Sequence, residues 1–339
     1  MITFAGVLSS SAQIQTSTLT SFGNFAGISG SACTYYGVNA GKINTGSKNV
    51  FVGTDAGITN TTGTNNTFTG YGVGGNLNCI SITCTSIGSS NSIYGSLSGN
   101  ENYSGSSNSF FGAMSGNKNA SGNSNVFIGT NAGKINTLGS NNTYVGFSAG
   151  GANNGARNIF IGANSGLAQT NQSGSALNDQ LFVDNSSTAT PLIWGDFAAD
   201  QLKLNGKVGV GAVVNFPTTV GTASVANYKL FVTGGILTEE LRIGLLPTWA
   251  DYVFNKDYKL KSLNEVENFI KENGHLPNVP SAKEVAANGI EVGNMAKIQQ
   301  EKIEELTLYV IEQNKVNEAQ GKEIEVIKAQ LKALLEAKK

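Results

Sequence analysis

Charged residues are scarce in this chain of 339 residues: Asp, Glu, Lys and Arg together make up 13%, and the formal net charge is -1. Between positions 13 and 176 the charged residues are Lys42, Lys48, Asp55, Glu101, Lys118, Lys134 and Arg157. Nucleic-acid binding depends on concentrated Lys and Arg, and the chain has no basic cluster, so we expect no nucleic-acid partner. No stretch approaches the roughly 18 apolar residues of a membrane helix, so we also expect no membrane span.

Histidine and cysteine are rare as well, and both shortages bear on catalysis and metal binding. The one histidine, His275, lies in a Gly-His-Leu-Pro turn, so we expect neither a Ser-His-Asp triad nor a zinc cluster. The three cysteines, Cys33, Cys79 and Cys84, are too few for a disulfide framework. Cys79 and Cys84 either bridge locally in an oxidising compartment or remain buried thiols. We therefore predict that the protein is not an enzyme and has no catalytic residue, cofactor or metal site.

The first 13 residues, MITFAGVLSSSAQ, contain a short apolar run followed by small residues. Two interpretations are open. The segment is either an ordinary N-terminus or the end of a secretory signal peptide, in which case residues 1–12 are removed by cleavage after Ala12. The positively charged start that is typical of such signals is missing.

Glycine, in contrast, is abundant, with 43 residues, and it marks a repeat. A glycine that follows a short strand-like run returns nine times, at Gly23, Gly37, Gly53, Gly70, Gly95, Gly112, Gly129, Gly146 and Gly162. Another glycine follows each of them four positions later, and the commonest step between repeats is 17 residues. Seven of the nine also have an asparagine four positions earlier, such as Asn49, Asn125 and Asn142.

The residues just before each first glycine are β-branched or aromatic, which is typical of strands bounded by tight turns. We expect each repeat to hold two short strands and two turns, with glycine supplying positive φ and asparagine tolerating it. Stacked repeats over residues 13–177 then form a β-solenoid or β-roll. The predicted internal ladder consists of Phe51, Phe68, Phe110, Phe127, Tyr144 and Phe160.

The N-x-F-x-G-x-x-A-G arrangement, present from Asn49 to Gly57, resembles the head repeats of trimeric adhesins and of repetitive bacterial and phage fibre proteins. The resemblance implies left-handed β-rolls that pack three abreast. The step here is longer than the repeat of the best-known adhesin heads. We expect the apolar surface to be hidden only when three chains wrap together.

Beyond residue 177 the character of the sequence changes twice. Residues 178–248 place short apolar alternations between Asn-Gly and Gly-Gly turns, which predicts a β-rich neck or shaft. Residues 249–294 contain two capping boxes, starting at Ser262 and Ser281, and each predicts a short helix that a glycine ends.

The segments WADYVF, HLPNVPSAKEV and KIEELTLYVIEQNK resemble the C-terminal region of bacterial surface and tail-fibre-like proteins. That resemblance implies trimer nucleation and termination of a fibre.

Residues 295–339 carry a heptad pattern that predicts a trimeric α-helical coiled coil. Isoleucine at both the a and the d position, as at Ile324 and Ile327, favours three or four strands over two. Asn317 and the glutamines around it make a polar middle that fixes the register. The alternative is a lone amphipathic helix folded against its own domain. The predicted trimerisation residues are Ile303, Leu306, Val310, Ile324, Ile327, Leu331 and Leu334.

The sequence thus predicts a mainly β chain with a solenoid head and a β neck, followed by a small α region and a coiled coil. We expect a homotrimeric, adhesin-like fibre at the cell surface or outside the cell, whose head binds a surface glycan or a protein receptor. The alternative is a tail fibre or receptor-binding protein on a phage or an injection particle. A module that binds ice or an ordered carbohydrate is a weaker alternative, because the Thr row at residues 59–67 does not continue in the other repeats. A glycan depolymerase is also weaker, because Asp55 and Glu101 fall at unrelated repeat positions.

Overall fold

The computed structural model describes residues 19–75, 86–167, 176–212, 215–244 and 249–337, and the backbone alone of residues 13–15. The chain divides into two units, residues 1–206 and residues 207–339, and each unit is described by itself. The predictions for the first 12 residues and for a bridge between Cys79 and Cys84 concern residues outside the described ranges.

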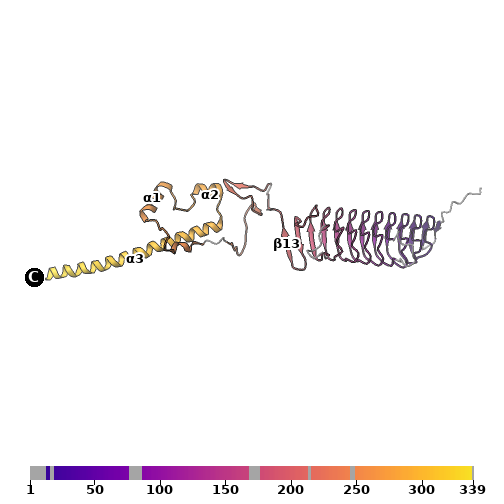
Figure 1. Ribbon diagram of the computed structural model, residues 1–339, viewed down its shortest axis with the longest axis horizontal. Coiled ribbons are helices and arrows are strands. Elements are labelled where there is room, and N and C mark those ends of the chain that lie inside the picture. Colours follow the sequence, from indigo (N-terminus) through magenta and orange to yellow (C-terminus); the bar gives the residue numbers. More distant parts are fainter. Residues whose placement is uncertain are drawn as a thin grey trace, which may run out of the picture. The chain divides into compact units, whose positions relative to one another are not determined.

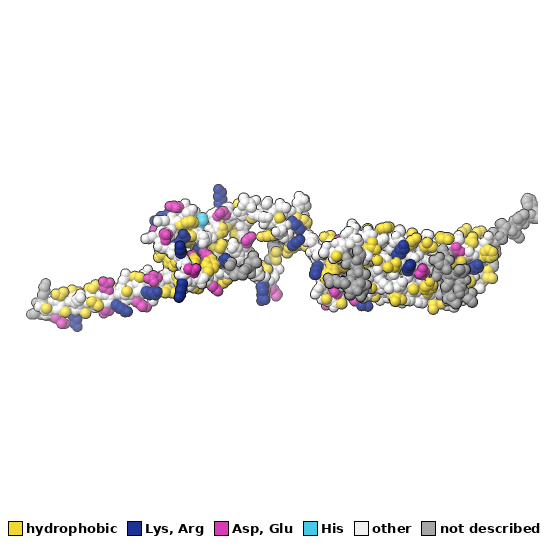
Figure 2. Space-filling model, viewed as in Figure 1, with side chains coloured by type: hydrophobic (Ala, Val, Ile, Leu, Met, Phe, Trp, Pro, Cys, Tyr) yellow, Lys and Arg dark blue, Asp and Glu magenta, His cyan; other side chains and the backbone are white. Residues whose placement is uncertain are grey.

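The first unit is a β-solenoid of about eight turns (Figure 1). Its strands form one 13-stranded sheet in which they lie side by side in chain order. Strands β2 to β11 are parallel, whereas β1, β12 and β13 run antiparallel to their neighbours. Charged side chains are sparse on the solenoid face seen in Figure 2. The strands are β1 Gln13–Gln15, β2 Leu19–Phe22, β3 Cys33–Tyr36, β4 Val50–Val52, β5 Thr67–Thr69, β6 Ser92–Tyr94, β7 Ser109–Phe111, β8 Val126–Ile128, β9 Thr143–Val145, β10 Ile159–Ile161, β11 Gln180–Val183, β12 Ile193–Asp196 and β13 Gln201–Leu204.

The solenoid core is a ladder of one large side chain per turn, because only the middle residue of each three-residue strand from β4 to β10 points inward. In β4, Phe51 is fully buried while Val50 and Val52 face outward. The in-register pairing places Phe68 of the next turn directly beside Phe51, and their ring centroids lie 4.9 Å apart. All six residues predicted for the ladder lie in it, and the complete set is Tyr35, Phe51, Phe68, Ile93, Phe110, Phe127, Tyr144, Phe160 and Phe182.

A single chain buries this ladder by stacking its turns, as the repeat pattern predicts, so hiding the ladder does not require a second or third chain. Each of the six predicted ladder residues is at most 1% exposed. Most turns carry a small residue three positions after the first glycine, such as Ala56, Ser115 or Ala132, all fully buried. Because these side chains are short, the turn closes tightly around its own aromatic ring.

Within the described residues, each turn contains one strand of three or four residues instead of the two that we expected. The rest of the turn bends repeatedly through positive φ, as at Lys48, Gly53, Asp55 and Gly57 in one turn. Such frequent bends leave no extended stretch for a second strand. The glycines also permit close stacking: a Cβ on Gly129, where φ is +131, would lie 2.4 Å from the carbonyl oxygen of the equivalent glycine one turn on.

The asparagines that stand four positions before a first glycine form a buried hydrogen-bond ladder, while other asparagines of the repeat, such as Asn65 and Asn141, adopt positive φ as expected. At Asn125, Oδ1 accepts from the backbone N–H of Asn142 at 3.0 Å, and Nδ2 donates to the carbonyl oxygen of Gly139 at 2.8 Å. The positive φ belongs to the residue before, Ser124. A side-chain amide has both a donor and an acceptor, so it can satisfy buried backbone groups of the next turn. The fully buried members are Asn49, Asn66, Asn91, Asn108, Asn125, Asn142 and Asn158.

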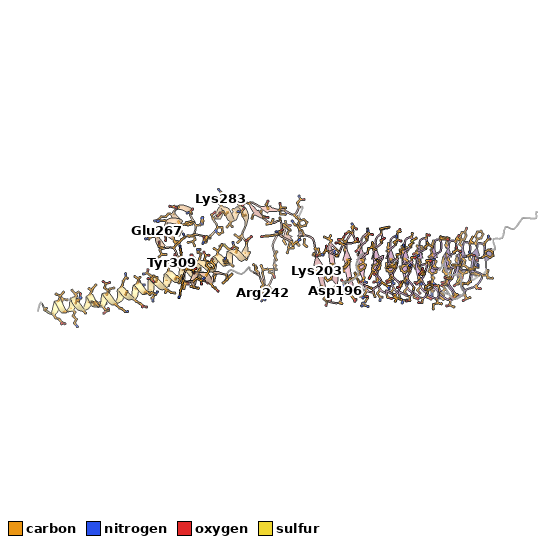
Figure 3. All side chains as sticks on the ribbon, viewed as in Figure 1. Asp196, Lys203, Arg242, Glu267, Lys283 and Tyr309 are labelled. Carbon is orange, nitrogen blue, oxygen red and sulfur yellow. The ribbon has the colours of Figure 1, made fainter. Side chains whose placement is uncertain are left out.

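The sheet continues past residue 177, where the repeat ends in the sequence. Strand β11 pairs in parallel with β10 and adds Phe182 to the ladder, and β12 and β13 then turn back antiparallel. Residues 178–206 therefore belong to the solenoid unit. The Lys203 ammonium on the last strand lies 4.6 Å from the ring of Trp194 (Figure 3 labels Lys203). A lysine on an edge strand disfavours further strand pairing.

The second unit contains short strand pairs followed by helices, as its sequence pattern predicts. Both short helices begin at the expected capping boxes: the hydroxyl oxygens of Ser262 and Ser281 accept from the backbone N–H three residues on, and Gly274 ends the first helix in the left-handed conformation. The long helix α3 is unbroken through Gly321. No helix in the described ranges is long and apolar enough to cross a membrane. The elements are β14 Val208–Val210, β15 Thr219–Val220, β16 Ala223–Ser224, β17 Leu230–Val232, η1 Ala250–Phe254, α1 Leu263–Asn273, α2 Ala282–Asn288 and α3 Val292–Ala337.

Candidate functional site

Helix α3 carries an apolar stripe that its own chain leaves exposed. All seven predicted trimerisation residues lie on α3, and each is between 50% and 65% exposed. Figure 2 shows hydrophobic side chains at intervals along this helix. Amphipathic helices normally bury such a face. The stripe, here called the α3 stripe, consists of Ile303, Leu306, Val310, Ile324, Ile327, Leu331 and Leu334.

Another side of α3, near its start, is held by tyrosines from the segment that precedes α1. The hydroxyl of Tyr252 donates to the Glu301 carboxylate, and the hydroxyl of Tyr258 donates to the Glu305 carboxylate. If Ile303 is heptad position a, Glu301 is f and Glu305 is c. These contacts therefore leave the a and d positions free.

The Glu301 carboxylate is held in its charged form. Burial acts to raise the pKa of Glu301, but hydrogen bonds from Lys302, Tyr252 and Asn278 outweigh it, and the pKa lies below the usual value. Burial acts to lower the pKa of Lys302, but its bonds to two carboxylates raise it overall. The Lys302 ammonium lies 2.8 Å from Glu301. The hydrogen bond to Glu301 is also the main reason why the pKa of Tyr252 rises to about 12. At neutral pH the cluster is a fixed ion pair with hydrogen-bonded neighbours and not a free acid or base.

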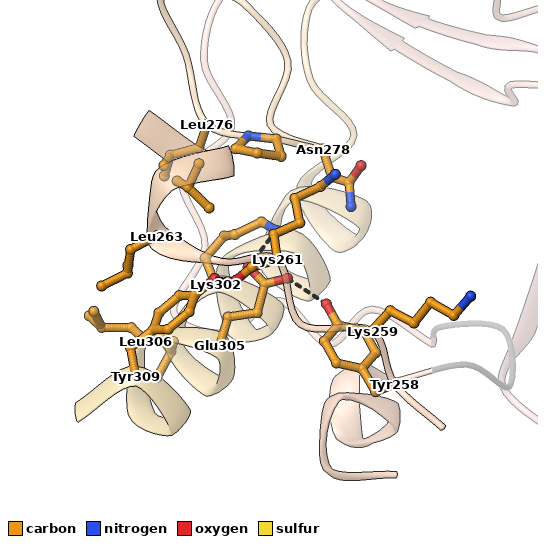
Figure 4. A pocket seen from close by; sticks show the side chains of 13 residues that line it. Tyr258, Lys259, Lys261, Leu263, Leu276, Asn278, Lys302, Glu305, Leu306 and Tyr309 are labelled. Atoms are coloured by element: carbon orange, nitrogen blue, oxygen red, sulfur yellow. Dashed lines mark hydrogen bonds and ion pairs between the residues drawn. The ribbon is translucent and has the colours of Figure 1, made fainter. Parts of the chain in front are cut away.

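A groove of about 560 Å³ lies between α1, the turn before α2 and the start of α3 (Figure 4). Its apolar lining comes from Leu263 and Val266 on α1, Leu276 in the turn, and Ile303 and Leu306 on α3. The floor of the groove is therefore the first part of the α3 stripe. The groove and the stripe form one continuous apolar surface.

The outer face of the solenoid sheet carries a second exposed row. Tyr36 is 57% exposed, and its ring stacks on that of Phe22 with centroids 5.2 Å apart. The rings of Tyr94 and Phe111 stack in the same way at 4.8 Å. Parallel sheets are usually covered on both faces, so this surface is a second candidate. The row, here called the outer row, consists of Phe22, Tyr36, Val52, Thr69, Tyr94, Phe111, Ile128, Val145 and Ile161.

The rare residues that could serve catalysis or metal binding are dispersed. The ring of His275 packs edge-on against Phe269 with centroids 5.6 Å apart, and its Nδ1 lies 3.0 Å from the carbonyl oxygen of Leu276. Cys33 is buried in the solenoid. Within the part of the chain that the structure describes, no three or more His, Cys, Asp or Glu residues cluster as metal ligands would.

Sequence reasoning missed the outer row, the groove and the tyrosine contacts. The outer row could have been found, because a residue that follows an inward-facing strand residue must face outward. The contacts of Tyr252 and Tyr258 join residues 49 and 47 positions apart. No local pattern signals such distant partners.

Comparisons with known proteins yield no relative: no family model, no curated protein and no solved structure matches this chain. The resemblance to adhesin heads and tail-fibre-like proteins therefore stays a prediction. Function has to be inferred from the residues and their geometry.

Proposed function

We propose that this protein is a non-enzymatic, homotrimeric fibre protein of the cell surface or extracellular space, whose β-solenoid head serves in attachment. The observation that carries the proposal is the exposed α3 stripe on a helix of 46 residues. Helices gain most of their stability by packing an apolar face. A second copy presents the same stripe at the same spacing, so self-association buries both.

Three copies suit the stripe better than two. Isoleucine stands at the a position 324 and at the d position 327, a choice that favours trimers or tetramers. The middle of the stripe is polar, and there Gln313 Nε2 donates to Asn317 Oδ1 at 2.9 Å. Such polar layers lower stability but penalise shifted registers, which keeps the copies aligned in a parallel fibre.

The outer row supports attachment through the head. Its tyrosine and phenylalanine rings expose apolar faces on which a sugar ring or an apolar protein side chain can stack. The neighbouring outward row of the same strands contains hydroxyl groups, as at Thr34 and Thr67, which can donate and accept hydrogen bonds. This combination suits a cell-surface glycan or a protein receptor.

Sedimentation equilibrium of the full chain tests the assembly. We expect a mass three times the 35.2 kDa of one chain. Ile327→Glu should dissociate the trimer, because it places three carboxylates in the buried seam. Val326→Glu is the matched control: Val326 is the adjacent residue, is also 55% exposed and lies outside the a and d positions. A monomeric wild type, or equal effects of the two variants, would refute the proposal.

Binding of the full chain to a glycan array and to intact cells tests attachment. We expect Tyr36→Ala to weaken binding, because Tyr36 belongs to the outer row. Tyr71→Ala is the control, since Tyr71 is 51% exposed but lies outside the strands. If both variants bind like the wild type, the outer row is not the attachment surface.

The same assembly would serve a tail fibre of a phage or an injection particle, and the resemblance of the C-terminal region to tail-fibre-like proteins favours that candidate. N-terminal sequencing of the native protein distinguishes the surface fibre from the tail fibre. Cleavage after Ala12 supports export as a surface protein. A mature chain that begins at Met1, found on purified particles, supports the tail fibre.

A further inference from the structure

We infer that residues 257–280, which include α1, clasp helix α3 of a neighbouring copy, with the groove as the docking site. This inference rests on the homotrimer proposed above. Helix α1 gives the first reason: it has 11 residues and well-formed caps at both ends, yet none of its residues is buried. Helices this short are marginal in water unless they pack against something. Leu263, on the groove side of α1, is 59% exposed and has no packing partner that buries it within its own chain.

The floor of the groove identifies the occupant. Ile303 and Leu306 are the first residues of the α3 stripe, and they line the groove together with Leu276. A second α3 that packs along the stripe in register has to pass over these two residues. It therefore enters the groove and meets the apolar side of α1. The α3 stripe, which packs against the other α3 helices, and the lining of the groove are thus parts of one interface.

The heptad register indicates which side of the neighbouring helix meets α1. The hydroxyl of Tyr309 donates to the carbonyl oxygen of Lys261 at 2.5 Å, and this contact ties the start of α1 to the g position of its own helix. In a parallel coiled coil, the g side of one helix faces the e side of the next. The e positions at this level are Gln300, Thr307 and Asn314. Helix α1 of each copy therefore reaches the e side of the next copy, and three such contacts close a ring.

A photo-cross-linking amino acid at Val266, which lines the groove, tests the contact directly in the full chain. We expect ultraviolet light to join separate chains, with the cross-linked peptide of the second chain falling within residues 300–314. A trimer that yields cross-links only within one chain would overturn the clasp and leave the proposed assembly intact. A monomeric protein would overturn both.

Dissociation of the trimer on dilution provides an independent measurement. Leu263→Ser should raise, by about tenfold or more, the protein concentration at which half of the trimers have dissociated. The reason is that each copy loses apolar burial against its neighbour. Leu237→Ser is the matched control, since Leu237 lies in the same unit, is fully exposed and is distant from the groove lining in the sequence. Equal dissociation curves for the two variants, with unchanged helix content, would refute the clasp.

Discussion

The adjacent residues Phe110 and Phe111 provide a sharp test of the solenoid core, because the two face opposite sides of strand β7. Phe110 is fully buried, and its ring lies 4.9 Å from that of Phe127, at 4° to it. Phe111 is 40% exposed on the outer row. Replacing each with alanine removes the same atoms from the same strand. The two variants therefore differ mainly in whether the lost ring was buried in the core or exposed on the outer row.

The expected cost of Phe110→Ala is about 3–5 kcal/mol in the stability of the affected turns. A Cβ on Gly116 would lie 2.5 Å from the Phe110 ring, so the ring fills the turn up to the backbone. The hydrogen-bonded ladders on both sides hinder collapse of the turn, which leaves a cavity. Phe111→Ala loses one exposed stacking contact, worth about 1 kcal/mol.

Amide hydrogen exchange resolved by peptide is the assay, since repeat proteins open locally. For Phe110→Ala we expect exchange of β6, β7 and β8 to accelerate about 100- to 5,000-fold, and for Phe111→Ala about fivefold. The solenoid turns farther away should change little. Equal effects of the two variants, or less than tenfold acceleration for Phe110→Ala, would refute the inward and outward assignment.

Two further predictions concern backbone conformation and pH. Gly129→Ala should destabilise the solenoid by more than about 2 kcal/mol, because positive φ and the contact with the next turn both exclude a Cβ. Gly321→Ala should instead stabilise α3 by about 0.5–1 kcal/mol, since nothing lies within 4 Å of the added atom, and thermal unfolding of both variants checks the opposite signs. The pKa of Glu301 is lower in the folded chain than its usual 4.5, so its stabilising contribution is present above that value and is lost as the pH falls through the folded pKa. Amide exchange of η1 should accelerate as the pH falls through the folded pKa of Glu301. Glu301→Gln should remove this pH dependence of exchange, whereas the exposed control Glu312→Gln should retain the pH dependence.

Several features of the fold could be predicted from the sequence because they depend on residues close together in the chain. The glycine spacing and the β-branched and aromatic residues before Gly53 or Gly129 predict the repeat and the inward position of the ring. The capping boxes at Ser262 and Ser281 predict the starts of α1 and α2, since a cap joins residues three positions apart. The spacing of the apolar residues on α3 predicts a stripe on one face, because helical periodicity is a local property.

Other features were decided only by the tertiary structure, because they depend on groups far apart in the chain. The role of Asn125 follows from backbone groups of the next turn, and these are brought within reach only when the turns stack. Strand β11 joins the sheet although its sequence lacks the repeat. It pairs with the free edge of β10 in a register that places Phe182 inward beside Phe160. The groove also arises only in three dimensions, where Leu263 of α1 and Ile303 of α3, 40 residues apart in the chain, line one apolar surface. Sequence periodicity therefore determined which residues face inward, and packing between distant segments decided which surfaces remain open for a partner.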